Sequence, residues 1–254
     1  MAGLLAIDVG NTQTALGLYE RGTLAKRWRL ATEPQRTGDE LGIFLGGLLE
    51  LSSLDGICMA STVPTLIRSY EELAGQVGAR LLVLGPGTKT GIAIRYDDPR
   101  EVGPDRIANA VAARQRYGAP SIVVDFGTST NFDVVSASGE YVGGVLAPGI
   151  EVSMNALFER AARLVKVDFA APETAIGKTT ESALRSGLVY GFAGQVDGIV
   201  ERIREELGVD AQTVATGGLA DLIVPHARTL DRIDPFLTLA GLRLVWERNH
   251  ADAA

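Results

Sequence analysis

Two short stretches of this chain carry the residue types that hold phosphate groups. The first, Asp8 to Ala15, reads Asp-Val-Gly-Asn-Thr-Gln-Thr-Ala, and the second, Asp125 to Thr130, reads Asp-Phe-Gly-Thr-Ser-Thr. Each follows an apolar run that is typical of a buried strand. Glycine lets backbone N–H groups approach a phosphate, threonine hydroxyls add donors, and an aspartate can hold a cation against the phosphate charge. A single stretch of this kind is more often an ordinary turn between strands.

The presence of two copies reverses that balance. Each copy continues with an apolar stretch, a turn that contains Gly22 or Gly139, and a further β-like stretch. A strand-turn-strand-turn-strand unit used twice predicts a duplicated domain with the two acidic turns facing each other across a cleft. Such a cleft suits ATP. The repeat alone places the boundary, so we expect domains over residues 1–118 and 119–254.

The composition excludes several classes of partner. The chain has 254 residues, of which 46% are hydrophobic and 22% are charged, and its formal net charge is −7. This acidic balance argues against nucleic acid or an anionic membrane as the main partner, because both reward a basic surface. The longest apolar runs are too short to span a bilayer, and no basic region precedes the first one. We therefore expect a cytoplasmic protein.

Cysteine and histidine are too scarce to carry the chemistry. Cys58 is the single cysteine, which excludes a disulfide framework and a cysteine-rich zinc site. It lies in an apolar run, where a buried structural thiol is the expected reading. With only His226 and His250, a histidine metal site or catalytic triad is also disfavoured. Carboxylates and hydroxyls must do the work.

The remaining elements alternate in the order expected of an α/β protein. The patterns predict strands over residues 56–60, 81–84 and 212–215, and helices over 37–54, 65–75, 103–118, 151–164, 181–207 and 235–246. The helix over 181–207 is expected to be interrupted near Gly191 and Gly194. In the helix over 151–164, one face is apolar and indicates core or a subunit interface; its members are Val152, Ala156, Leu157, Ala161 and Leu164. The β-α-β order over residues 56–84 implies parallel pairing beside the first meander.

One helix start places a carboxylate where a general base could work. Pro104 suits the first helical position, and Asp105 then falls in the first turn. The helix dipole there favours the ionised carboxylate that a base needs. The competing interpretation is that Asp105 only complements the dipole.

Three glycine-containing loops have a weaker link to nucleotide binding. Residues 85–91 and 176–180 resemble phosphate loops, but neither has the spacing of a P-loop, so plain connections are expected. Thr216-Gly217-Gly218 follows a strand, and its glycines could pass close to an adenine or ribose. A tight strand-to-helix turn explains them equally well.

Taken together, the motifs resemble type III pantothenate kinase over nearly the whole chain. The matching stretches come in that family's order, and they are Asp8 to Thr12, Gly103 to Arg106, Asp125 to Thr128, Gly143 to Gly149 and Ala215 to Ala220. The resemblance implies an α/β, actin-like ATPase (ASKHA) fold with two duplicated domains, each a mixed β-sheet flanked by helices. It also implies a homodimer that phosphorylates pantothenate with ATP, the first step of coenzyme A biosynthesis.

The resemblance also implies roles for individual residues. Asp105 would be the proton acceptor, and Asp125 would bind a monovalent cation, K⁺ or NH₄⁺, beside Mg²⁺ and ATP. The residues implied to contact ATP are Asp8, Val9, Gly10, Asn11, Thr12, Gln13, Thr14, Ala15 and Thr128. Those implied to contact pantothenate are Tyr96, Gly103, Pro104, Asp105, Arg106 and Thr180.

The chain departs from the family pattern at three positions. Pro104 stands where Ala is usual, Asn131 where Thr is common, and Thr179 where Asn is frequent. Two other functions remain open: a kinase of the same superfold that acts on another acceptor, and a dimeric ATP-binding regulator without turnover. Intact Asp8, Asp105 and Asp125 argue against the regulator.

Overall fold

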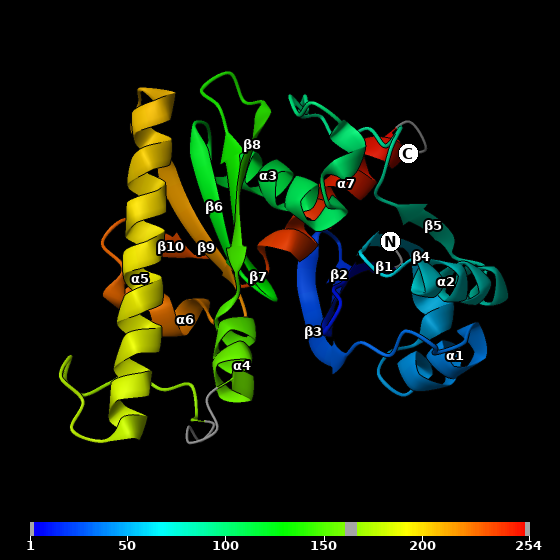
Figure 1. The fold of residues 1–254 in the computed structure, drawn as a ribbon. Coiled ribbons are helices and arrows are strands. Elements are labelled where there is room, and N and C mark those ends of the chain that lie inside the picture. Colours follow the sequence, from blue (N-terminus) through cyan, green and yellow to red (C-terminus); the bar gives the residue numbers. More distant parts are fainter. Residues whose placement is uncertain (1–2, 161–166, 252–254) are drawn as a thin grey trace. The chain divides into compact units, whose positions relative to one another are not determined.

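The computed structural model describes residues 3–160 and 167–251, which fold into two compact units (Figure 1). One unit comprises Met1–Ala112 together with Leu237–Ala254, and the other comprises Ala113–Phe236. The sequence predicts a different division, with one domain over residues 1–118 and the other over 119–254. The units differ from that division chiefly because the end of the chain groups with the first unit.

A five-stranded mixed sheet forms the centre of the first unit. Its strands are β1 (Gly3–Val9), β2 (Gln13–Glu20), β3 (Thr23–Ala31), β4 (Leu54–Ser61) and β5 (Arg80–Val83), in the order β3-β2-β1-β4-β5. The first three strands form an antiparallel meander, and β4 and β5 add in parallel. The parallel pairing expected beside the meander is confirmed.

The two faces of this sheet differ in the size of their side chains. On one face, Leu5 and Ile7 share a buried core with the helices α1 (Gly38–Gly46) and α2 (Pro64–Val77). On the other face, Gly56 lies so close to Trp246 of α7 (Leu237–His250) that a Cβ would come within 2.0 Å of the indole ring. Small residues therefore allow α7 to pack closely against this face.

The second unit repeats this topology. Its strands are β6 (Ser121–Phe126), β7 (Ser129–Val135), β8 (Tyr141–Pro148), β9 (Gln212–Gly217) and β10 (Arg232–Ile233), in the order β10-β9-β6-β7-β8. Again three strands form a meander and two strands add in parallel. The duplication predicted from the two acidic turns is confirmed, although β10 has only two residues and left no pattern in the sequence.

Helices of the second unit cover one face of its sheet. They are α4 (Ile150–Arg160), α5 (Thr180–Leu207) and α6 (Ala220–Ile223), and α5 runs beside the sheet as the long yellow helix of Figure 1. Ile122, Val124 and Phe132 point into the core between this sheet and the helices. Short 3₁₀ turns complete the two units at η1 (Leu51–Ser53), η2 (Pro99–Glu101) and η3 (Val224–His226).

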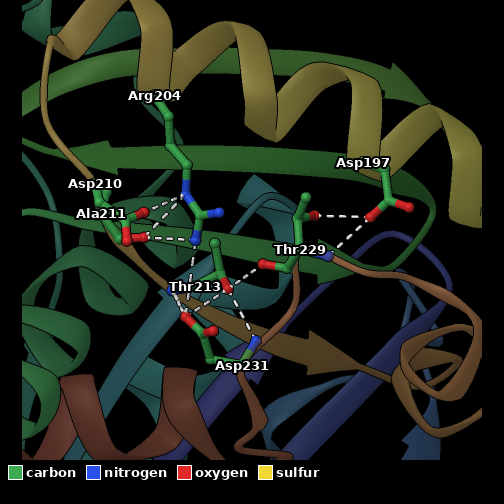
Figure 2. Close-up of polar contacts among 7 residues, drawn as sticks. All are labelled: Asp197, Arg204, Asp210, Ala211, Thr213, Thr229 and Asp231. Carbon is green, nitrogen blue, oxygen red and sulfur yellow. Dashed lines mark hydrogen bonds and ion pairs between the residues drawn. The ribbon is translucent and has the colours of Figure 1, made fainter.

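A polar network, buried at Asp197, Thr213 and Thr229, ties α5 to the segment that enters β10 (Figure 2). The Asp197 carboxylate accepts hydrogen bonds from the backbone N–H and the hydroxyl of Thr229, both at 2.9 Å. Burial raises the pKa of Asp197, but these bonds and those from Arg228 outweigh burial, so the net pKa is lowered. Two residues after Thr229, the Asp231 carboxylate accepts hydrogen bonds from the backbone N–H and the hydroxyl of Thr213 on β9. Helix and sheet edge are thereby joined by charge-assisted hydrogen bonds.

Three helix predictions need correction. The helix expected over 37–54 ends at Gly46, because Gly47 caps it and the chain turns into η1. The interruption expected near Gly191 and Gly194 is wrong: α5 is continuous for 28 residues, and open space surrounds both glycines.

In α4, the core interpretation of the apolar face is wrong, since Val152 and Leu157 are exposed and Met154 is buried instead, and the alternative of a subunit interface stays a prediction. Residues 161–164 of that prediction lie outside the described residues. Within the described part of the chain, no helix is both long and apolar enough to cross a bilayer.

Candidate active site

The first acidic stretch forms a tight connection between β1 and β2. Asp8 is the next-to-last residue of β1 and stands half-buried, and Asn11 and Thr12 lie exposed in the turn. The Gly10 N–H donates to the carbonyl of Gln13 at 3.0 Å, which closes a three-residue turn. The turn therefore presents hydroxyl and amide groups at its tip, directly after a carboxylate.

The end of β4 braces the same turn from the side. The backbone N–H and the hydroxyl of Thr62 both donate to the Val9 carbonyl, at 3.0 and 3.1 Å. Thr62 lies 53 residues from Val9 in the sequence, and only the parallel pairing of β1 with β4 brings them together. Sequence patterns missed Thr62, although a hydroxyl directly after a strand is a usable signal.

The second acidic stretch is one residue shorter. β6 ends at Phe126 and β7 begins at Ser129, so Gly127 and Thr128 alone form the turn, closed by the Gly127 N–H on the Ser129 carbonyl. Asp125 is half-buried, and Asn131 stands opposite it on β7. The Ser129 hydroxyl donates to the Asn131 side-chain oxygen at 2.6 Å. The departure at Asn131 is thus accommodated by a local hydrogen bond.

A glycine shapes the space around Asp125. Gly217 ends β9 beside Phe126, with a φ of +93°. A Cβ on Gly217 would lie 2.6 Å from Asp125 Oδ1 and equally close to the Phe126 backbone. Close packing against this carboxylate therefore explains Gly217 of the Thr216 to Gly218 stretch.

Asp105 occupies the first turn of α3 (Pro104–Tyr117), as predicted. A Cβ on Gly103 would lie only 2.4 Å from Asp105 Oδ1. The glycine therefore leaves room for the carboxylate. Burial raises the pKa of Asp105 above its usual value, opposed by hydrogen bonds from the N–H groups of Arg106 and Asp105 and by the Arg106 charge. A raised pKa in a carboxylate that still accepts hydrogen bonds suits a proton acceptor.

Helix α7 holds this end of α3 in place. A Cβ on Gly241 would lie 2.0 Å from the Ala108 carbonyl oxygen, so the two helix backbones nearly touch. At the next residue of α3, Asn109 Oδ1 accepts a hydrogen bond from the Thr238 hydroxyl of α7 at 2.7 Å. Leu239 of α7 also packs on Gly17 of β2. The base candidate is thus fixed to the sheet that carries Asp8.

The residues expected to contact pantothenate are distributed over both units. Tyr96 and Gly103 to Arg106 lie in the first unit and Thr180 in the second. Thr180 is the first residue of α5 and is exposed. Thr179 caps that helix, since its hydroxyl accepts from the Ser182 N–H at 3.1 Å. The departure at Thr179 therefore has a structural role of its own.

The first unit contains Asp8 to Ala15, Tyr96 and Asp105, and the second contains Asp125, Thr128 and Thr180. That the two acidic turns face each other stays a prediction. Among the residues that the structure describes, no group of three or more histidine, cysteine or acidic side chains could hold a metal ion. A cation at Asp125 would therefore draw its other ligands from backbone, hydroxyl or phosphate oxygens.

Comparison with known proteins decides the family. A family model described as type III pantothenate kinase matches residues 4–202. The chain belongs to this family. A type III pantothenate kinase from Frankia alni is 53% identical over 248 residues, which cover 97% of this chain and 99% of the relative.

Solved structures show that this type III pantothenate kinase family member has an actin-like fold. A Baf family protein from Campylobacter jejuni superposes with a TM-score of 0.63 at 20% identity, covering 97% of this chain and 99% of that one. Component A of (R)-2-hydroxyglutaryl-CoA dehydratase from Acidaminococcus fermentans gives a TM-score of 0.58 at 14% identity. The match covers 99% of this chain and 100% of that one. The ASKHA fold inferred from the motifs is confirmed.

Proposed function

We propose that this protein transfers the γ-phosphoryl group of ATP to the primary hydroxyl of pantothenate, the first step of coenzyme A biosynthesis. Family membership over nearly the full chain supports the reaction. The observation that carries it in the structure is Asp105, half-buried in the first turn of α3 beside Gly103.

Asp105 is the proton acceptor in this proposal. The hydroxyl oxygen of pantothenate attacks the γ-phosphorus, its proton passes to the Asp105 carboxylate, and the bond to the β-phosphate oxygen breaks to release ADP. Phosphoryl transfer depends mainly on alignment and on neutralising charge, so the base contributes only part of the rate enhancement.

The two acidic turns hold the nucleotide. Asp8 to Ala15 and Thr128 contact ATP, and their exposed amide and hydroxyl groups are suitable donors for phosphate oxygens. Mg²⁺ bound to ATP neutralises phosphate charge. Among the pantothenate contacts, Tyr96, Gly103 to Arg106 and Thr180, the guanidinium of Arg106 suits a carboxylate.

Asp125 fits a monovalent cation. Its carboxylate lies half-buried at a strand end, in a space that a Cβ on Gly217 would fill. Oxygen ligands in such a cradle suit K⁺ or NH₄⁺, which when bound would neutralise phosphate charge beside Mg²⁺. The proposal includes a cytoplasmic location, where ATP and K⁺ are both abundant.

A homodimer completes the proposal. Apolar side chains are exposed on the edge strand β8 and on the neighbouring α4: Val142 (38%), Leu146 (61%), Val152 (44%) and Leu157 (42%). Contiguous exposed apolar patches mark contact surfaces, and in this proposal these four side chains contribute to one. Light scattering should give twice the chain mass for the wild type and one chain mass for Leu146→Asp. Ile43→Asp, at a more exposed site (81%) on α1, should remain a dimer, and a monomeric wild type would refute the assembly.

The decisive assay measures ADP formation with Mg²⁺, with and without pantothenate, in K⁺ and then in Na⁺ buffer. Turnover that requires pantothenate and collapses in Na⁺ supports the reaction and the cation. Turnover with a sugar or acetate instead identifies another acceptor, and ATP binding without turnover identifies a regulator. Asp105→Asn should bind ATP and lose about 100-fold or more in kcat; full turnover would remove Asp105 from the role of base.

A further inference from the structure

Thr32, the residue directly after β3, makes three hydrogen bonds to the first acidic turn. Its hydroxyl donates to the Gly10 carbonyl at 2.8 Å, and its backbone N–H donates to the Thr12 carbonyl at 3.0 Å. The Thr14 hydroxyl lies 2.9 Å from the Thr32 hydroxyl oxygen. Because the single Thr32 proton already goes to Gly10, Thr14 is the donor in this pair. A chain of hydrogen bonds therefore runs from Thr14 through Thr32 to Gly10.

These bonds fix the direction of two peptide groups in the turn. In a trans peptide the carbonyl and the following N–H point in opposite directions. With the Gly10 carbonyl held toward Thr32, the Asn11 N–H is directed away from it. With the Thr12 carbonyl held in the same way, the Gln13 N–H is also directed away. Thr32 thus directs two backbone donors away from itself, and N–H groups that are held in fixed directions can cradle phosphate oxygens.

The second unit contains the structural equivalent of Thr32. Gly149 directly follows β8, and its N–H donates to the Thr128 carbonyl at 3.1 Å, as the Thr32 N–H does to Thr12. A Cβ on Gly149 would lie 2.3 Å from the Thr128 oxygen and 2.6 Å from the Gly127 oxygen. The two-residue turn leaves no room for a side chain. The first turn is one residue longer, and there the Thr32 side chain is accommodated and bonds to the Gly10 carbonyl.

We propose that Thr32 is a positioning residue for ATP: it holds the Asn11 and Gln13 amides in the orientation that binds the phosphates. The inference rests on the proposed nucleotide role of Asp8 to Ala15. The first turn is held by the hydroxyl of Thr32, whereas Gly149, at the equivalent place in the second unit, has no side chain. The phosphate contacts of the first turn therefore depend on a side chain outside that turn. Thr32 itself does not touch the nucleotide.

The test compares Thr32→Val with Thr32→Ser. Valine keeps the shape and the backbone N–H of Thr32 but removes both hydroxyl contacts, whereas serine keeps the hydroxyl. We expect Thr32→Val to raise KM for ATP about tenfold, the effect of losing one or two hydrogen bonds, and to leave KM for pantothenate within about twofold. Thr32→Ser should stay within about threefold of the wild type. Thr23→Val, at the opposite end of β3, should behave as the wild type.

ATP titration by calorimetry, without pantothenate, separates this inference from the proposed reaction. If the wild type binds ATP but never phosphorylates pantothenate, the reaction fails while the titration still tests Thr32. Unchanged ATP affinity in folded Thr32→Val, or equal losses in the valine and serine variants, would overturn the inference. If Thr32→Val does not fold by circular dichroism, Thr32→Ala carries the same comparison with Thr32→Ser.

Discussion

At the scale of single residues, Asp105 combines a functional gain with a cost to folding. Its side chain is half-buried beside Gly103, and burial raises its pKa although two backbone N–H groups and Arg106 act in the opposite direction. A group whose pKa is higher in the folded than in the unfolded state destabilises the fold at pH values above the folded pKa. The cost disappears as the pH falls toward the unfolded value near 3.8.

Replacement of Asp105 by Asn should therefore stabilise the protein while it abolishes the base. We expect the melting temperature of Asp105→Asn to exceed that of the wild type by a few degrees at pH 7, because the uncharged amide carries a smaller desolvation cost. The difference should shrink as the pH is lowered toward 4. Calorimetry at several pH values measures it. A variant that melts below the wild type at pH 7 would contradict this account.

Cys58 should be chemically silent in the folded protein. Its side chain is fully buried, and burial raises its pKa to about 12, against a small opposing effect of a backbone hydrogen bond to Trp246. Thiol reagents attack the thiolate. At pH 8 we expect no reaction with Ellman's reagent in buffer and one thiol per chain in denaturant. Rapid labelling of the native protein would show that Cys58 is accessible.

At the scale of elements, close backbone contact between helices depends on Gly241. Because a Cβ there would meet the Ala108 carbonyl at 2.0 Å, Gly241→Ala should force α7 away from α3 and destabilise the protein by about 3 kcal/mol. Gly75 in α2 has no atom within 4 Å of its Cβ position. Gly75→Ala is the matched control and should stabilise by about 0.5–1 kcal/mol. Urea unfolding measures both, and equal effects would contradict the packing argument.

The attachment of α5 to the β10 segment should depend on Asp197 far more than on its neighbour. Asp197→Ala leaves the buried Thr229 donors unpaired, at a cost of about 3 kcal/mol. Glu201, one turn later on α5, is 52% exposed and only reaches Arg228 at 3.4 Å, so Glu201→Ala should cost less than about 0.5 kcal/mol. Since the Asp197 pKa is lowered, its contribution is present above about pH 4 and is lost as the pH falls through the folded pKa. Urea unfolding at pH 7 and pH 3 checks both statements.

The sequence predicted the elements that repeat or that carry strong periodicity. The strands around Asp8 and Asp125 were recognisable because two copies could be compared, and α3 because Pro104 and Gly118 mark its ends. β10 and α6 were missed, since two and four residues are too short to leave a period. The end of α1 at Gly46 is set by a cap that competes with the apolar pattern continuing beyond it.

Within the candidate site, residue types revealed the carboxylates but not the residues that orient them. Asp8, Asp105 and Asp125 stand out by their local motifs. Thr32 and Thr62 act on the first turn from 22 and 53 residues away, through strand pairing. Contacts of this kind depend on register, which no local pattern specifies.

At the scale of the whole molecule, the chain enters the second unit at residue 113 and returns to the first at residue 237. We expect native-state hydrogen exchange to reflect this path: the amides of α7 should share their slowest opening free energy with β1 and β4 rather than with α5. Mass spectrometry of peptic fragments over a denaturant series measures it. Co-exchange of α7 with α5 would contradict the division into units.

Because α7 belongs to the first unit, the chain path also sets the order in which the two units can fold during synthesis on the ribosome. The second unit is one uninterrupted segment, so all of its strands have been synthesised before the first residue of α7 is added. The sheet of the first unit, although made first, waits for the final helix to cover Gly56 and Cys58. A nascent chain should therefore complete its second half before its first. Premature termination shortly after Phe236 would release a product with a complete second unit and a first unit whose sheet lacks α7. Such a product would be a substrate for chaperones and proteases.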